Sequence, residues 1–185
     1  MKTKIDPIRR GLSGGLLAAL LALATATHAA DLPPLAHGMN AQTVKKMAPN
    51  LKLPDLDGQT HDLAALKGHV VLVNFWATWC PPCRREMPSM ERLVRKLQGT
   101  HFVALAVDVG ENADTIQAFT SQLETTPSFP ILLDSRSKAM QAWKVAGLPT
   151  TYLIDKNGRI AYSAVGGREF DHPEIEQTVR DLLKR

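Results

Sequence analysis

The chain has 185 residues and a formal net charge of +4, and only two of its residues are cysteines. Two cysteines exclude a small protein held together by several disulfides, and they exclude a four-cysteine zinc ribbon. The positive charge would indicate an anionic partner such as nucleic acid only if it belonged to the folded domain.

The N-terminal segment carries most of this charge. Residues 1–10 contain four basic side chains and one acid, and residues 12–26 form an uncharged stretch rich in Leu and Ala. Ala29 and Ala30 follow, and this order is typical of a secretory signal peptide over residues 1–30. An uncleaved membrane anchor is the alternative, although the apolar stretch is shorter than the roughly 20 residues that cross a bilayer. No cysteine stands near the cleavage site, so a lipoprotein signal is excluded.

Removal of residues 1–30 leaves 18 basic and 17 acidic residues, a net charge of +1. The basic balance therefore belongs to the export signal, and we expect no nucleic-acid partner. The remaining chain is long enough for one domain with a hydrophobic core. We expect a monomer in the periplasm, where a cysteine pair can be oxidised.

The elements of the mature chain follow in order. Residues 31–48 contain Pro33 and Pro34 and show no sustained helical or strand periodicity. This predicts a linker with a turn of helix near residues 41–47. The folded domain is predicted to follow at 49–185. Two extended runs between residues 51 and 63 flank Asp57-Gly58 and predict a hairpin. Residues 69–76 are almost continuously apolar, as expected for a central strand that is buried on both faces.

Strands and helices then alternate. Helical periodicity begins at Arg84 and runs to Gln98, with Met87 and Met90 on its apolar side. The last helix opens with Asp171 and Glu174 as a predicted capping pair. Further strands are predicted at residues 102–107, 130–133, 150–154 and 159–165, and further helices at 112–123 and 137–144. This order predicts an α/β fold, a mixed sheet with helices on both faces.

The two cysteines stand where the predicted central strand ends and a helix begins. At a helix N-terminus the dipole lowers the pKa of the Cys80 thiol and favours Cys80 as the nucleophile, and Cys83 follows one turn later as the resolving thiol. A structural disulfide and half of a metal site are the alternatives. Zinc would need two more ligands, and none of the six histidines forms a spaced pair with this motif. Two cysteines at this spacing after a buried strand favour redox chemistry.

Glu86 lies three residues after Cys83 and shares a helical stripe with Met90 and Leu93. The stripe predicts that Glu86 points inward, where burial raises the pKa of a carboxyl group. In that position Glu86 could exchange protons with the thiols. A surface glutamate paired with an arginine is the alternative.

Residues 75–88 (FWATWCPPCRREMP) and 147–155 (GLPTTYLID) resemble the thioredoxin superfamily, and more narrowly the exported TlpA/ResA-like thiol:disulfide oxidoreductases. The resemblance covers about residues 48–184. It implies a thioredoxin fold with an N-terminal hairpin and an inserted helix and strand, a cis peptide before Pro149 that faces Cys80, an active-site glutamate at Glu86, and no cofactor or metal. Asn74 stands where ordinary thioredoxin has a buried acid, so the proton handling of thioredoxin does not transfer.

The resemblance also implies a set of partners, while the sequence does not fix the direction of electron flow. The partners are disulfides of exported proteins, such as apocytochrome c or a copper chaperone, and a membrane thiol carrier that recharges the enzyme. Pro81 and Pro82 lack a backbone N–H, which predicts a moderately lowered pKa of Cys80 and favours a reductase. Trp79 and Leu148 are the expected substrate-binding residues. A copper chaperone and a thiol peroxidase remain the alternatives of other classes.

Overall fold

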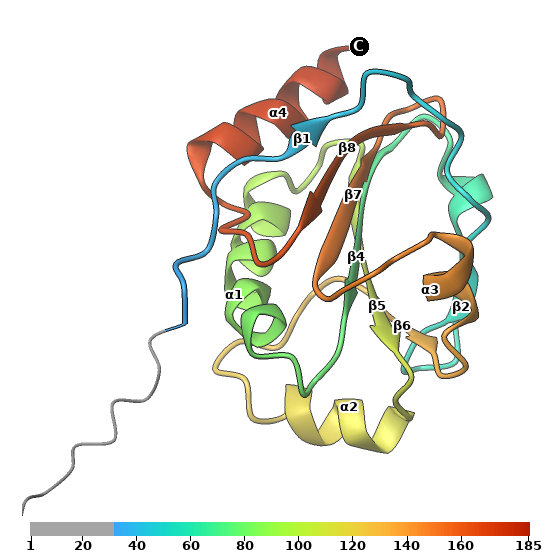
Figure 1. Ribbon diagram of the computed structural model, residues 1–185, viewed down its shortest axis with the longest axis vertical. Coiled ribbons are helices and arrows are strands. Elements are labelled where there is room, and N and C mark those ends of the chain that lie inside the picture. The colour runs from blue at the N-terminus through green and yellow to red at the C-terminus, as the bar shows by residue number, and fades with distance from the viewer. Residues whose placement is uncertain (1–31) are drawn as a thin grey trace, which may run out of the picture. The chain divides into compact units, whose positions relative to one another are not determined.

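The computed structural model describes residues 32–185, and the predicted signal peptide at 1–30 lies outside the described residues. The centre is a six-stranded sheet with the order β1-β8-β7-β4-β5-β6 (Figure 1). Strand β4 (Val70–Trp76) pairs in parallel with β5 (Phe102–Val109) and antiparallel with β7 (Thr150–Ile154). All seven residues of β4 are buried, as the apolar run predicts.

The other strands complete the two edges of the sheet and a separate hairpin. Strand β6 (Ile131–Asp134) runs parallel to β5, and β8 (Ile160–Val165) pairs antiparallel with β7. The hairpin predicted around Asp57-Gly58 consists of β2 (Lys52–Pro54) and β3 (Thr60–Asp62), and the 3₁₀ helix η1 (Leu63–Leu66) follows it.

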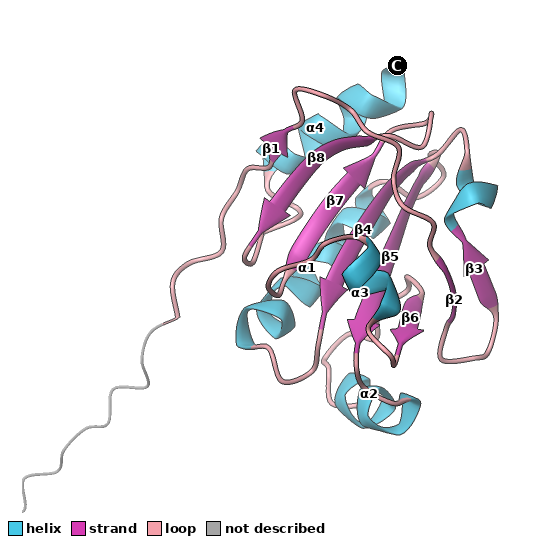
Figure 2. Cartoon of the chain, turned by 45° about the vertical axis from the view of Figure 1, so that its right-hand side comes forward, coloured by secondary structure: helices cyan, strands magenta, loops and turns pink. Residues whose placement is uncertain are grey.

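Helices cover both faces of the sheet (Figure 2). Helices α1 (Pro81–Lys96), α2 (Ala113–Thr120) and α4 (Pro173–Lys184) contribute to the hydrophobic cluster on one face. Helix α3 (Lys138–Ala142) packs on the other face with residues of the β2–β3 hairpin and η1. The predicted mixed α/β architecture is therefore confirmed, with α2 and β6 as the inserted helix and strand. Within residues 32–185, no helix is long and apolar enough to cross a membrane.

The segment before the hairpin departs from its prediction. Strand β1 (Asn40–Ala41) pairs with β8 at Ser163 and Tyr162, and Met47 forms a bridge to Arg159. The helical turn predicted near residues 41–47 is wrong, and the described part of the predicted linker lies along the sheet from residue 36 onward. A strand of two residues is too short to show a periodicity in the sequence. Its formation depends on pairing with β8 and not on the local sequence.

Two predicted helix ends also need correction. The N-cap of α4 is His172, whose Nδ1 accepts a hydrogen bond from the Glu174 N–H at 3.3 Å. The predicted Asp171–Glu174 capping pair is wrong because the Asp171 carboxylate pairs with Arg92 of α1 at 2.7 Å. Helix α2 has Asn112 as its N-cap, at the predicted start, but ends at residue 120, before the predicted end at 123.

Candidate active site

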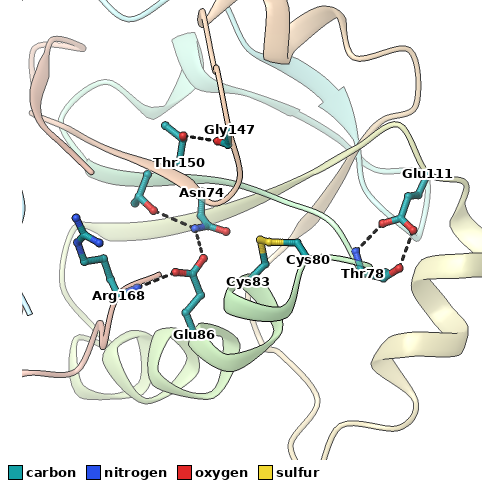
Figure 3. The surroundings of a disulfide bond; sticks show 10 residues. Asn74, Thr78, Cys80, Cys83, Glu86, Glu111, Gly147, Thr150 and Arg168 are labelled. Atoms are coloured by element: carbon teal, nitrogen blue, oxygen red, sulfur yellow. Dashed lines mark hydrogen bonds between the residues drawn. A yellow bond between two sulfur atoms is a disulfide. The ribbon is translucent and has the colours of Figure 1, made fainter. Parts of the chain in front are cut away.

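A disulfide joins Cys80 and Cys83 at the N-terminus of α1 (Figure 3). Cys80 is the N-cap residue, and its carbonyl oxygen accepts a hydrogen bond from the Arg84 N–H at 3.1 Å. Pro81 and Pro82 form the first turn, where a missing N–H costs the helix nothing. Cys80 is 3% exposed and Cys83 is fully buried. The cysteine closer to solvent is therefore the one that the sequence predicts as the nucleophile.

A loop that contains a cis peptide, between Leu148 and Pro149, precedes β7. The Thr150 hydroxyl donates to the Gly147 carbonyl at 2.6 Å, and the Gly166 N–H donates to the Pro149 carbonyl at 2.8 Å. Leu148 packs against the core cluster that contains both cysteines. Among residues 32–185, no hydrogen bond uses the N–H or the C=O of Leu148. This stretch of backbone is therefore available to pair with another chain.

Glu86 is fully buried one helical turn after Cys83. Its Oε1 accepts a hydrogen bond from Asn74 Nδ2 at 2.8 Å, and its Oε2 accepts one from the Arg168 N–H at 3.0 Å (Figure 3). Burial raises the pKa of Glu86 to about 8, although both hydrogen bonds and the charge of Arg168 act in the opposite direction. The inward orientation is confirmed, and the surface alternative is wrong.

Arg168 is a residue of this site that the sequence analysis missed. Its guanidinium donates to the carbonyl groups of Gly38, Gly166 and Gly167, and burial lowers its pKa. The residue lies in the loop between β8 and α4, 82 positions from Glu86. No local pattern in the sequence indicates this contact, because it depends on how β8 and α4 pack against α1.

Two large apolar side chains near the cysteines face solvent. Trp79, directly before Cys80, is 67% exposed, and Val165, at the end of β8, is 69% exposed. Val165 pairs with Thr150, the neighbour of Pro149, so it lies at the same loop. Trp76, by contrast, is fully buried. The exposure of Trp79 agrees with the expected position at the rim of the site, and Val165 was not anticipated.

The site combines two cysteines three residues apart at a helix N-terminus, directly after the central strand, with a cis-proline loop and a buried carboxyl group. This combination defines a thioredoxin-like thiol–disulfide oxidoreductase. Comparison with known families agrees with this class. The sequence pattern of the AhpC/TSA family matches residues 44–163, and the chain belongs to this family.

Individual relatives give the same picture. The chain is 42% identical over 120 residues to the thiol-disulfide oxidoreductase ResA of Geobacillus thermodenitrificans. The aligned region covers 65% of this chain and 68% of the relative. The chain is also 38% identical over 139 residues to ResA of Halalkalibacterium halodurans, covering 75% and 74% of the two chains. A thiol:disulfide interchange protein of Chlorobium tepidum superposes with a TM-score of 0.66 at 27% identity, covering 77% of this chain and 99% of the other. The chain is therefore an enzyme of thiol–disulfide exchange.

Proposed function

We propose that this enzyme reduces disulfides of exported proteins in the periplasm. The observation that carries the proposal is the first turn of α1, where Pro81 and Pro82 follow the N-cap Cys80. Neither proline has an N–H to donate to a Cys80 thiolate. Strong oxidants stabilise their reduced form through that thiolate, so a first turn with fewer donors favours a reductant. Export is supported by the basic and then apolar pattern of residues 1–30.

In the proposed reaction the Cys80 thiolate attacks one sulfur of the client disulfide. The client S–S bond breaks, a Cys80–client S–S bond forms, and the second client sulfur leaves as a thiolate. Cys83 loses its proton to the Glu86 carboxylate and attacks Sγ of Cys80. The mixed disulfide then breaks and the Cys80–Cys83 bond forms. The client gains two electrons, the enzyme loses two, and a membrane thiol carrier returns the enzyme to its dithiol form.

The client is proposed to bind as an extended segment beside the cis-proline loop. The free N–H and C=O of Leu148 could pair with the client backbone by strand addition, while exposed Trp79 contacts its side chains. The resemblance to TlpA/ResA-like proteins indicates the haem-site cysteines of apocytochrome c, or the cysteines of a copper chaperone, as clients. In both cases the reduced thiols would be needed for a later ligation step.

The test of the proposed direction is to replace Cys83 by serine in the native host. Without the resolving thiol, Cys80 should remain bound to its client, and the trapped protein is identified after purification under non-reducing conditions. The matched control carries serine at both positions and should trap nothing. Capture of apocytochrome c or copper-site proteins supports a reductase. Capture of folding oxidants alone would reverse the proposed direction of electron flow.

Trp79→Ala tests the proposed client contact. We expect KM for a protein disulfide to rise about fivefold or more, because an exposed aromatic anchor is lost, with little change in kcat. The rate with a small aromatic-free disulfide should stay unchanged. Val44→Ala is the control, since Val44 is similarly exposed, at 71%, but lies in the segment before β2. An equal loss with both substrates would indicate that Trp79 supports the loop and not client binding.

A further inference from the structure

A second acidic side chain, Glu111, lies on the other side of the cysteines from Glu86 (Figure 3). The Glu111 carboxylate accepts two hydrogen bonds from Thr78, one from the backbone N–H and one from the hydroxyl, each at 2.6 Å (Figure 3). Thr78 lies two residues before Cys80, in the short connection between β4 and α1. Glu111 comes from the loop between β5 and α2, 33 positions away. The carboxylate therefore ties the backbone that leads into Cys80 to a separate part of the fold.

Asp108, near the end of β5, lies beside this contact. It is fully buried, and neither of its carboxyl oxygens has a hydrogen-bond donor among residues 32–185. Its side chain and that of Glu111 are within hydrogen-bonding reach of each other. Two ionised carboxylates cannot form that bond, because neither has a proton to donate. The nearest N–H, that of Glu111, does not reach good hydrogen-bond geometry with Asp108. A buried carboxylate with so little compensation is strongly unfavourable, so Asp108 is expected to be protonated and to donate to Glu111.

We propose that Asp108 and Glu111 share one proton and that this proton holds Thr78, and with it the backbone before Cys80, in place. Both acids are then positioning residues for thiol–disulfide exchange, and neither touches the reacting sulfurs. The inference rests on exchange at the Cys80–Cys83 pair and not on the proposed reductase direction.

Loss of the shared proton has a defined consequence. With the proton present, the pair carries one negative charge, and the Glu111 carboxylate accepts from Asp108 and twice from Thr78. Burial, followed by the interaction with the Glu111 side chain, raises the pKa of Asp108 to about 8, although the backbone N–H of Glu111 acts in the opposite direction. The charge of Asp134 on β6 adds to the rise. The two charged groups that act on the pKa of Asp108, Glu111 and Asp134, are thus both acids. Above that pH two adjacent anions repel each other, and the Glu111–Thr78 contact weakens.

The decisive measurement is the amide NMR signal of Thr78 in the oxidised protein, which has no free thiol to titrate. We expect this signal to shift with a midpoint near pH 8 in the wild type. The shift should disappear in Asp108→Asn, whose amide donates to Glu111 but cannot lose a proton there. In Glu111→Gln the midpoint should move to lower pH, because Asp108 stays buried but loses its anionic neighbour. Glu86 also has a pKa of about 8, so the titration is repeated in a Glu86→Gln background. A shift that remains there does not come from the ionisation of Glu86.

Asp114→Asn is the matched control, because Asp114 is an exposed acid in the first turn of α2. It should leave the Thr78 titration unchanged. No titration of Thr78 in the wild type, a titration that persists in Asp108→Asn, or an unchanged midpoint in Glu111→Gln would overturn the shared proton.

The functional consequence is measured by alkylation of Cys80 in the reduced enzyme. At pH 9 the ionised Asp108 of the wild type adds a negative charge and weakens the Glu111–Thr78 contact, and both effects disfavour the Cys80 thiolate. Asp108→Asn should therefore react about threefold faster than wild type. At pH 6.5 the two rates should be equal. Equal rates at both values would show that the pair does not act on Cys80, whatever the direction of electron flow.

Discussion

Replacement of Cys80 by serine is expected to lower the rate of disulfide exchange by at least about 10³-fold, because a hydroxyl is not ionised at neutral pH and cannot replace the thiolate nucleophile. Of the two cysteines, Cys80 is the one with measurable exposure, and it stands at the N-cap, where the helix dipole acts on its sulfur. The measurement is single-turnover reduction of a small disulfide by the pre-reduced enzyme.

Cys83→Ser is the matched variant for this prediction. It should retain the first attack at close to the wild-type rate and then stop at the mixed disulfide, with one client sulfur bound per enzyme. Cys80→Ser should show neither the fast attack nor the adduct. A Cys80→Ser protein that still reacts quickly through Cys83 would invert the two roles, which the complete burial of Cys83 argues against.

Glu86→Gln is expected to change the pH dependence of stability. The folded protein holds this carboxyl with a pKa of about 8, above the ordinary value of 4.5, so between these values the folded state binds a proton that the unfolded chain releases. Stability therefore falls as the pH rises through this window, and the full penalty is present above pH 8. Glutamine does not ionise, so the variant should be more stable than wild type by of order 5 kcal/mol at pH 9 and similar to it at pH 5.

Urea unfolding of the oxidised protein at the two pH values measures this effect. Glu91→Gln is the control, because Glu91 is also buried on α1. Burial acts to raise the pKa of Glu91, but hydrogen bonds from Ser128 and Arg95 outweigh it, and the pKa is lowered. Glu91→Gln should therefore lose stability relative to wild type at pH 9. An identical response of the two variants would show that the local environment of Glu86 does not govern its protonation.

The same substitution is expected to slow exchange. Without a carboxylate to take the proton of Cys83, the resolving step at pH 8, where Glu86 is about half ionised, should be about 10²-fold slower. The dependence of this step on a group that titrates near pH 8 should also disappear. Stopped-flow measurement of mixed-disulfide decay across pH follows the step directly. An unchanged pH profile in Glu86→Gln would exclude Glu86 as the proton acceptor.

Local sequence determined the parts of the site that lie within one helix. The spacing of Cys80 and Cys83 at the start of a helical period predicts their meeting, since residues three apart lie one above the other on a helix. The stripe shared with Met90 predicts the burial of Glu86 for the same reason. The cis peptide before Pro149 was expected only from the family resemblance, because the residues alone do not specify it.

The remaining contacts depend on the tertiary structure. Arg168 reaches Glu86 across 82 positions, and Glu111 reaches Thr78 across 33. Both contacts follow from the register of the sheet and the packing of its loops, which no short period in the sequence encodes. The sequence by itself thus determined which residues carry the redox chemistry. Only the tertiary structure decided which groups set their protonation and position, because burial and the approach of distant charges exist only in the folded chain.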